Sequence, residues 1–184
     1  MKTLQNRILK LSLCAILIAG AAVLYAAGSG KQLPVTGQTE VHTTNDDGSY
    51  QTGNDVPSTR FLDNGDGTVT DNMTGLMWVK SPDSTTRTWA NALTYCEGLD
   101  SASHTDWRLP TVSELETLTN YSQSAPATWL NGQGFTNVQN YYWSSTTYAP
   151  DAAYAWYVGM GHGRVGGDIK AYGYYVWPVR SAAP

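Results

Sequence analysis

Three aspartates in one short stretch are the residues whose type and spacing most resemble a metal site. Asp63, Asp66 and Asp71 place carboxylates on and around a tight turn, and calcium prefers several oxygen ligands gathered on such a loop. The run lacks the alternating ligands and the distal glutamate of an EF-hand loop. Its Asn-Gly and Asp-Gly pairs are also ordinary turn formers. We therefore expect a turn here, with calcium as the alternative and no other cofactor.

Aromatic residues crowd the C-terminal part of a chain that is 11% aromatic and only 14% charged. Eight Tyr and three Trp lie between Tyr141 and Trp177, more than one small sheet can bury. Adaptable binding surfaces combine Tyr with Gly and Ser. We predict a ligand-binding surface here, and the alternative is a solvated loop that uses Tyr for packing. The predicted residues are Tyr148, Tyr154, Tyr157, His162, Arg164, Asp168, Lys170, Tyr172 and Tyr174.

The sequence contains none of the usual catalytic patterns. It has no Gly-x-Ser-x-Gly elbow and no His-Glu-x-x-His zinc motif, and His42, His104 and His162 lie far apart. Cys96 falls in a helical pattern, which favours a buried small hydrophobe over a reactive thiol or an intermolecular bridge. We therefore expect that the protein is not an enzyme.

Turn and helix signals predict the elements that position these residues. Residues 61–71 predict a β-hairpin, because Gly65 and Gly67 can supply the positive φ of its turn, and 76–79 predict the next strand. Apolar residues at helical spacing predict a helix over 88–99. Thr111 and Glu114 fit a capping box, which predicts a second helix ending near Tyr121.

The C-terminal part alternates short apolar runs with glycine. Residues 141–143, 154–158 and 174–180 predict strands, and the glycines between 159 and 167 predict turns. If Trp156 and Val158 face the core, strand alternation turns Tyr157 outward. The order of elements indicates an α+β fold. The tryptophans expected in its core are Trp78, Trp89, Trp107, Trp143 and Trp156.

The N-terminal segment has the pattern of a targeting sequence. Three basic residues precede an uncharged apolar run, so residues 1–28 predict a signal peptide or an uncleaved anchor. Residues 29–58 form a polar leader and 59–181 the folded domain. The formal charge is −4, and losing the three basic residues with 1–28 would lower it to −7. Such a balance argues against nucleic acid as a partner.

Three ordered motifs resemble the domain at the C-terminus of the Legionella collagen-like adhesin. They are RFLDNGDGTVTD (60–71) with TGLMW (74–78), DWRLPT (106–111), and YWSST (142–146) with YVWPVR (175–180). The resemblance implies a C-type-lectin-like fold, with two helices packed on a twisted antiparallel sheet and long C-terminal loops. It also implies a bacterial protein that is periplasmic, cell-surface or secreted.

These observations favour an exported ligand-binding or adhesion-type module. We expect a polysaccharide or protein ligand on the Tyr-rich C-terminal surface, no nucleic acid, and membrane contact only through residues 1–28 if they are not cleaved. The alternative is a structural envelope domain engaged in protein–protein assembly. An enzyme related to formylglycine-generating enzymes is the less favoured reading, because no Cys follows Cys96.

Overall fold

The first sheet is built on the predicted hairpin. The computed structural model describes residues 35–51, 53, 57 and 59–182. Strands β1 (Phe61–Asp63), β2 (Thr68–Asp71) and β3 (Leu76–Val79) form an antiparallel meander, and β7 (Val179–Ser181) pairs with β3 as the fourth strand. Gly65 and Gly67 have positive φ in the β1–β2 turn. The predicted hairpin and the strand after it are confirmed.

The second sheet contains a strand where turns were expected. Strands β4 (Tyr141–Thr147), β5 (Tyr154–Gly159) and β6 (Arg164–Ile169) form an antiparallel sheet in that order. Glycine weakens a strand interior, so Gly166 and Gly167 had suggested a turn. A Cβ on Gly166 would lie 2.7 Å from the Tyr157 hydroxyl, and one on Gly167 would lie 3.2 Å from the Tyr148 ring. The two glycines therefore make room for tyrosine rings.

Four short helices occur in the described part of the chain, two more than expected: α2 (Asp47–Tyr50), α3 (Trp89–Glu97), α4 (Val112–Thr117) and α5 (Pro126–Asn131). The capping box of α4 is confirmed, because the Glu114 amide donates to the Thr111 hydroxyl and the Thr111 amide donates to the Glu114 carboxylate. Helix α4 ends at Thr117 and not near Tyr121. Helices α2 and α5 are too short to show a periodic pattern.

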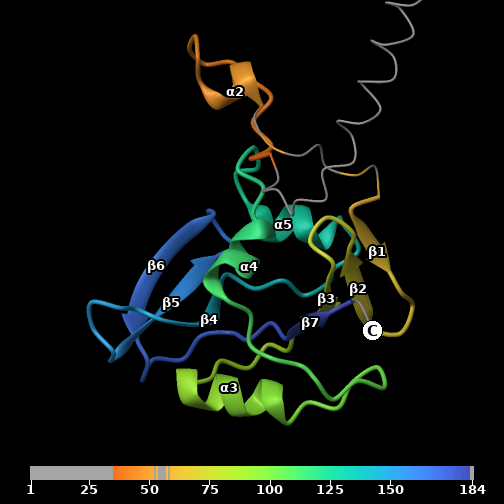
Figure 1. The fold of residues 1–184 in the computed structure, drawn as a ribbon, viewed down its shortest axis with the longest axis vertical. Coiled ribbons are helices and arrows are strands. Elements are labelled where there is room, and N and C mark those ends of the chain that lie inside the picture. Colours follow the sequence, from red (N-terminus) through yellow and green to blue (C-terminus); the bar gives the residue numbers. More distant parts are fainter. Residues whose placement is uncertain (1–34, 52, 54–56, 58, 183–184) are drawn as a thin grey trace, which may run out of the picture. The chain divides into compact units, whose positions relative to one another are not determined.

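Two apolar clusters hold the sheets and helices together. Figure 1 shows α3 on one side of the sheets and α4 and α5 on the other. Ala92 and Cys96 of α3 pack with Trp143 and Ala155, while leucines of α4 and α5 pack in the other cluster with Trp78 and Trp177. Trp78, Trp107 and Trp143 are buried as predicted, whereas Trp89 and Trp156 are only half-buried.

The α+β class is confirmed, but the detailed architecture differs from the expected one. Two antiparallel sheets replace the single sheet. Residues 154–158 form strand β5 as predicted, whereas part of the expected C-terminal loop region is strand β6. The second difference arises because Gly166 and Gly167 lie inside β6. The C-type-lectin-like fold implied by the resemblance stays a prediction.

The polar leader makes direct contact with the domain. The Tyr121 amide donates to the carbonyl oxygen of Thr36 at 2.9 Å. Gly37, with a φ of 89°, lies so close to the Asn120 side chain that a Cβ would collide with it. The predicted signal peptide or anchor, residues 1–28, lies outside the described residues. Within the part that is described, none of the helices has the length and apolar character needed to cross a membrane.

Candidate functional site

Three tyrosine rings gather on one face of the β4–β5–β6 sheet. The Tyr174 ring stacks on Tyr141 with ring centroids 5.7 Å apart and meets Tyr157 edge-on at 5.0 Å. The buried Trp143 ring lies 4.6 Å from Tyr174. Tyr141 is 37% exposed, so the cluster reaches solvent. We call Tyr141, Tyr157 and Tyr174 the tyrosine platform.

Strand register explains why these rings meet. Residues directly opposite each other in an antiparallel sheet share a face. Tyr141 of β4 is opposite Gly159 of β5, and Gly159 is in turn opposite Arg164 of β6. Two residues earlier on β5, and on the same face, Tyr157 is opposite Gly166 of β6. A Cβ on Gly159 would lie 3.1 Å from the Tyr141 ring. Each platform ring from the sheet therefore lies against a glycine of the neighbouring strand.

A carboxylate anchors the third ring of the platform. The Tyr174 hydroxyl donates to Oδ2 of Asp168 at 2.5 Å. Burial, together with this carboxylate, raises the pKa of Tyr174, so its hydroxyl stays protonated at neutral pH. Asp168 lies on the platform face, since alternation puts it on the same side of β6 as Arg164 and Gly166. The platform thus has a carboxylate bonded to one of its rings, and Arg164 is an exposed residue on the same face of β6.

A second aromatic group lies on the opposite face of the same sheet. Tyr148 packs against Trp156 with centroids 5.0 Å apart and against Tyr154 at 6.2 Å. Alternation along β5 separates Trp156 from Tyr157, as predicted. It also puts Tyr154 on the opposite face from Tyr157, although both were expected on one surface. The face of Tyr157 is nevertheless covered in part, because Tyr157 packs against the α3 cluster and is half-buried.

The nine predicted binding residues therefore do not form one surface. Tyr157, Tyr174, Asp168 and Arg164 belong to the platform face, and Tyr148 and Tyr154 to the other. His162 is exposed in the β5–β6 turn, and Tyr172, which follows β6, is 54% exposed. Tyr141 was missed. Tyr141 lies two residues before Trp143, so alternation could have placed both side chains on the same face of the strand. Which face is open to solvent, however, depends on how the helices pack.

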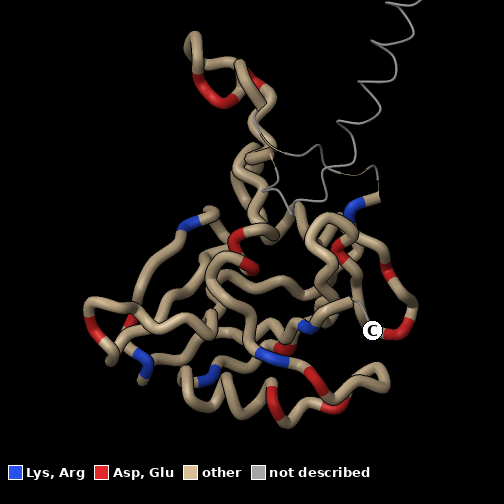
Figure 2. The backbone as a smooth tube through the Cα atoms, viewed as in Figure 1, with Lys and Arg blue, Asp and Glu red and all other residues tan. Residues whose placement is uncertain are grey.

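Basic charge near the platform is sparse (Figure 2). Five of the seven described Lys and Arg residues form ion pairs with carboxylates, and the two others are Arg164 and Lys170. The Lys170 ammonium lies 4.0 Å from the centre of the Trp89 ring and donates to the Thr147 hydroxyl. Lys170 is six positions after Arg164 along an extended strand, a distance of about 20 Å. They therefore do not form a dense cationic patch.

The three aspartates considered for calcium have three separate partners. Asp63 accepts from Lys80, which lowers its pKa, and Asp66 accepts from the Thr68 hydroxyl at 2.6 Å. Asp71 is buried in an ion pair with Arg60. In the part of the chain that the structure describes, no group of three or more His, Cys, Asp or Glu residues could hold a metal ion. Turn formation explains Asp63 and Asp66, whereas the burial of Asp71 was not expected.

The thiol of Cys96 is buried, which disfavours its thiolate. Its side chain is fully enclosed in the α3 cluster, and burial raises its pKa to about 12. The thiolate is the nucleophilic form of cysteine, so this position cannot supply one at neutral pH. The prediction of a buried small hydrophobe is confirmed.

The motifs that flank the platform also identify the chain. A family model, the Lcl C-terminal domain, matches residues 67–180, which is more than half of the chain and includes the whole platform. No curated protein matches the chain. The family match confirms the resemblance carried by the three ordered motifs, and the protein belongs to the Lcl C-terminal domain family.

Proposed function

We propose that the protein is an exported, non-enzymatic binding module whose tyrosine platform binds a polysaccharide. The observation that carries the proposal is the set of three tyrosine rings, one of them 37% exposed, with Asp168 and Arg164 beside them. Aromatic rings present flat apolar faces to the C–H groups of a sugar, and a few polar groups then fix its orientation. The buried Trp143 ring, 4.6 Å from the Tyr174 ring, supports the platform at that point.

A neutral polysaccharide fits this surface better than a polyanion. The formal charge is −4 and would be more negative without residues 1–28. Like charges repel over roughly a Debye length, and Arg164 and Lys170 are too far apart to act as one anion site. A protein ligand on the same platform is the competing outcome.

The family supports export, and the chemistry of the described residues supports binding over catalysis. The Lcl C-terminal domain belongs to a collagen-like adhesin family, and adhesins act outside the inner membrane. Cys96 is enclosed, with a pKa of about 12, so it is no candidate for a nucleophile. Periplasmic, cell-surface and secreted locations all agree with the predicted N-terminal segment.

A glycan array with the full-length protein tests the proposal. We expect binding of neutral glycans and a loss of roughly tenfold in affinity for Tyr141→Ala, because truncating an aromatic anchor commonly costs more than 1 kcal/mol. Tyr50→Ala is the matched control, since Tyr50 is 64% exposed on α2 and outside the platform.

Two results would contradict the proposal. Equal glycan binding by folded Tyr141→Ala and the unchanged protein would remove the platform as the site. If no glycan bound but light scattering showed self-association that Tyr141→Ala abolished, the platform would serve protein–protein assembly, as in a structural envelope domain.

A further inference from the structure

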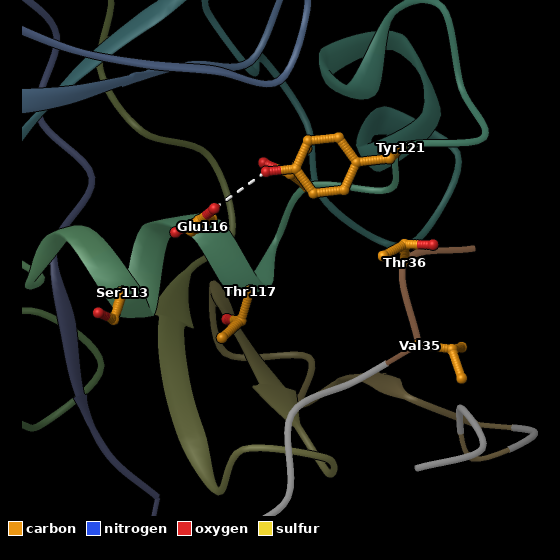
Figure 3. Close-up of a pocket in the computed structure, with 7 residues that line it drawn as sticks. Val35, Thr36, Ser113, Glu116, Thr117 and Tyr121 are labelled. Atoms are coloured by element: carbon orange, nitrogen blue, oxygen red, sulfur yellow. Dashed lines mark hydrogen bonds between the residues drawn. The ribbon is translucent and has the colours of Figure 1, made fainter. Parts of the chain in front are cut away.

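A pocket of about 320 Å³ lies between helix α4 and the polar leader (Figure 3). Val35 and Thr36 line its leader side, and Ser113, Glu116 and Thr117 line its helix side. These three helix residues are spaced i, i+3 and i+4, so they share one face of α4. The pocket contains no residue of the tyrosine platform.

Tyr121 forms a firmly held wall of this pocket. Its hydroxyl donates to Oε1 of Glu116 at 3.1 Å, as the dashed line in Figure 3 marks. Its amide donates to the Thr36 carbonyl on the leader side. Burial, followed by the nearby Glu116 carboxylate, raises the pKa of Tyr121 to about 12, so the hydroxyl remains a donor. The residue is still 48% exposed, which leaves ring surface for a ligand.

The pocket also contains a buried hydroxyl without a partner. Thr119 lines the pocket and is only 7% exposed, and its Oγ1 has no hydrogen-bond partner among the described residues. Most buried side-chain polar atoms have at least one partner, and a hydroxyl left unpaired in the interior is destabilising. This hydroxyl is enclosed, and a ligand hydroxyl in the pocket would supply the missing partner once the Thr119 side chain turned toward it.

We infer that this pocket binds one neutral sugar ring. Its described lining combines threonine and serine hydroxyls, one carboxylate and one aromatic ring, and no Lys, Arg or His is among these described residues. Glu116 would accept hydrogen bonds from sugar hydroxyls and would repel an anionic ligand. The volume lies at the lower end of the range of small-molecule pockets, which suits a single ring.

The β5–β6 turn links the pocket to the tyrosine platform. A Cβ on Gly163 would lie 2.8 Å from the Thr119 methyl and 3.1 Å from the Tyr121 ring. The Gly163 amide donates to the Gly159 carbonyl at 2.8 Å, and Gly159 lies against Tyr141. The two sites therefore flank one tight turn. The inference shares its ligand class with the proposed function but rests on different residues, so each can fail alone.

Amide chemical-shift titration of the full-length protein with glucose, galactose and N-acetylglucosamine tests the inference. We expect the Thr119 and Tyr121 amides to shift and saturate at millimolar sugar. Glu116→Gln should weaken the affinity roughly tenfold or more, since a hydrogen bond to a charged group is lost. Glu97→Gln, which changes an exposed acid on α3 outside both sites, should leave the affinity unchanged.

Thr119→Val separates a binding hydroxyl from a purely structural one. It keeps the shape of the side chain and removes the unpartnered hydroxyl, so we expect a more stable protein with weaker sugar binding. No shift at Thr119 and Tyr121 with any of the three sugars would overturn the inference. The inference would also be overturned if Glu116→Gln and Thr119→Val bound the sugar with the same affinity as the unchanged protein. Either result would leave the platform proposal intact.

Discussion

The buried Arg60–Asp71 ion pair allows the sharpest test of the structure. Nη2 and Nε of Arg60 donate to the two carboxylate oxygens of Asp71 at 2.9 and 3.1 Å. Arg60 also donates to the Thr117 carbonyl at 2.7 Å, and Asp71 accepts the Met73 amide. The side chains are 7% and 0% exposed. The pair joins the start of β1 and the end of β2 to the end of α4.

Asp71→Asn removes the negative charge and leaves the size of the side chain almost unchanged. Breaking a buried pair by removing one partner costs about 3–5 kcal/mol, because the other charge stays buried. Arg60 keeps its bond to Thr117, which places the expected loss near the lower end, at about 3 kcal/mol. A loss of that size lowers the melting temperature of a domain of this length by roughly 6–12 °C.

Urea unfolding followed by tryptophan fluorescence measures this loss. The double variant Arg60→Met/Asp71→Asn should recover part of the stability, since no buried charge remains unpaired. Calcium provides the second readout, because Asp71 was a candidate ligand. We expect that added calcium does not change the melting temperature of the unchanged protein. A loss below about 1 kcal/mol, or a calcium-dependent gain that Asp71→Asn abolishes, would refute the reasoning.

Three further predictions follow from local contacts. Gly166→Ala should destabilise the protein by about 1–3 kcal/mol and change the near-UV circular dichroism, because its Cβ would collide with Tyr157; an unchanged spectrum and stability would contradict the ring placement. Cys96 should react with a thiol reagent at pH 8 only after unfolding, given its pKa of about 12, and peptide mass mapping locates the label; rapid labelling of the folded protein would contradict its burial. Burial raises the pKa of Glu114, but hydrogen bonds led by that from Arg108 outweigh it and leave the pKa below its usual value. The stability from this group is present above an unfolded pKa near 4.3 and is lost as the pH falls through the folded value. Glu114→Gln should therefore flatten the acid limb of a stability–pH curve. An unchanged limb would count against the hydrogen bonds between Arg108 and Glu114.

Much of the local structure was predictable from the sequence. The Asn-Gly and Asp-Gly pairs located the β1–β2 hairpin, and the apolar spacing from Trp89 to Cys96 located α3. Thr111 and Glu114 located the start of α4 with its capping box intact. Each of these signals concerns residues within a few positions of one another, so their chemistry acts before any long-range contact forms.

The candidate site was predictable only in part. The sequence placed aromatic residues in the C-terminal part, and strand alternation correctly separated Tyr157 from Trp156 and Val158. It did not reveal that Gly166 and Gly167 lie in a strand. A glycine there becomes favourable only when a tyrosine ring from the neighbouring strand covers it, and that requires the register of β5 against β6.

Long-range packing decided which aromatic residues act together. Tyr141 and Tyr174 are far apart in sequence. Their rings meet because the segment that contains Tyr174 and Tyr175 runs beside β4, where the Tyr175 amide donates to the Tyr141 carbonyl. The sugar-sized pocket likewise depends on a contact between distant segments. The hydrogen bond from the Tyr121 amide to the Thr36 carbonyl holds the leader against α4. Turns and caps are encoded by neighbouring residues, whereas these surfaces depend on contacts between segments that come together only in the folded chain.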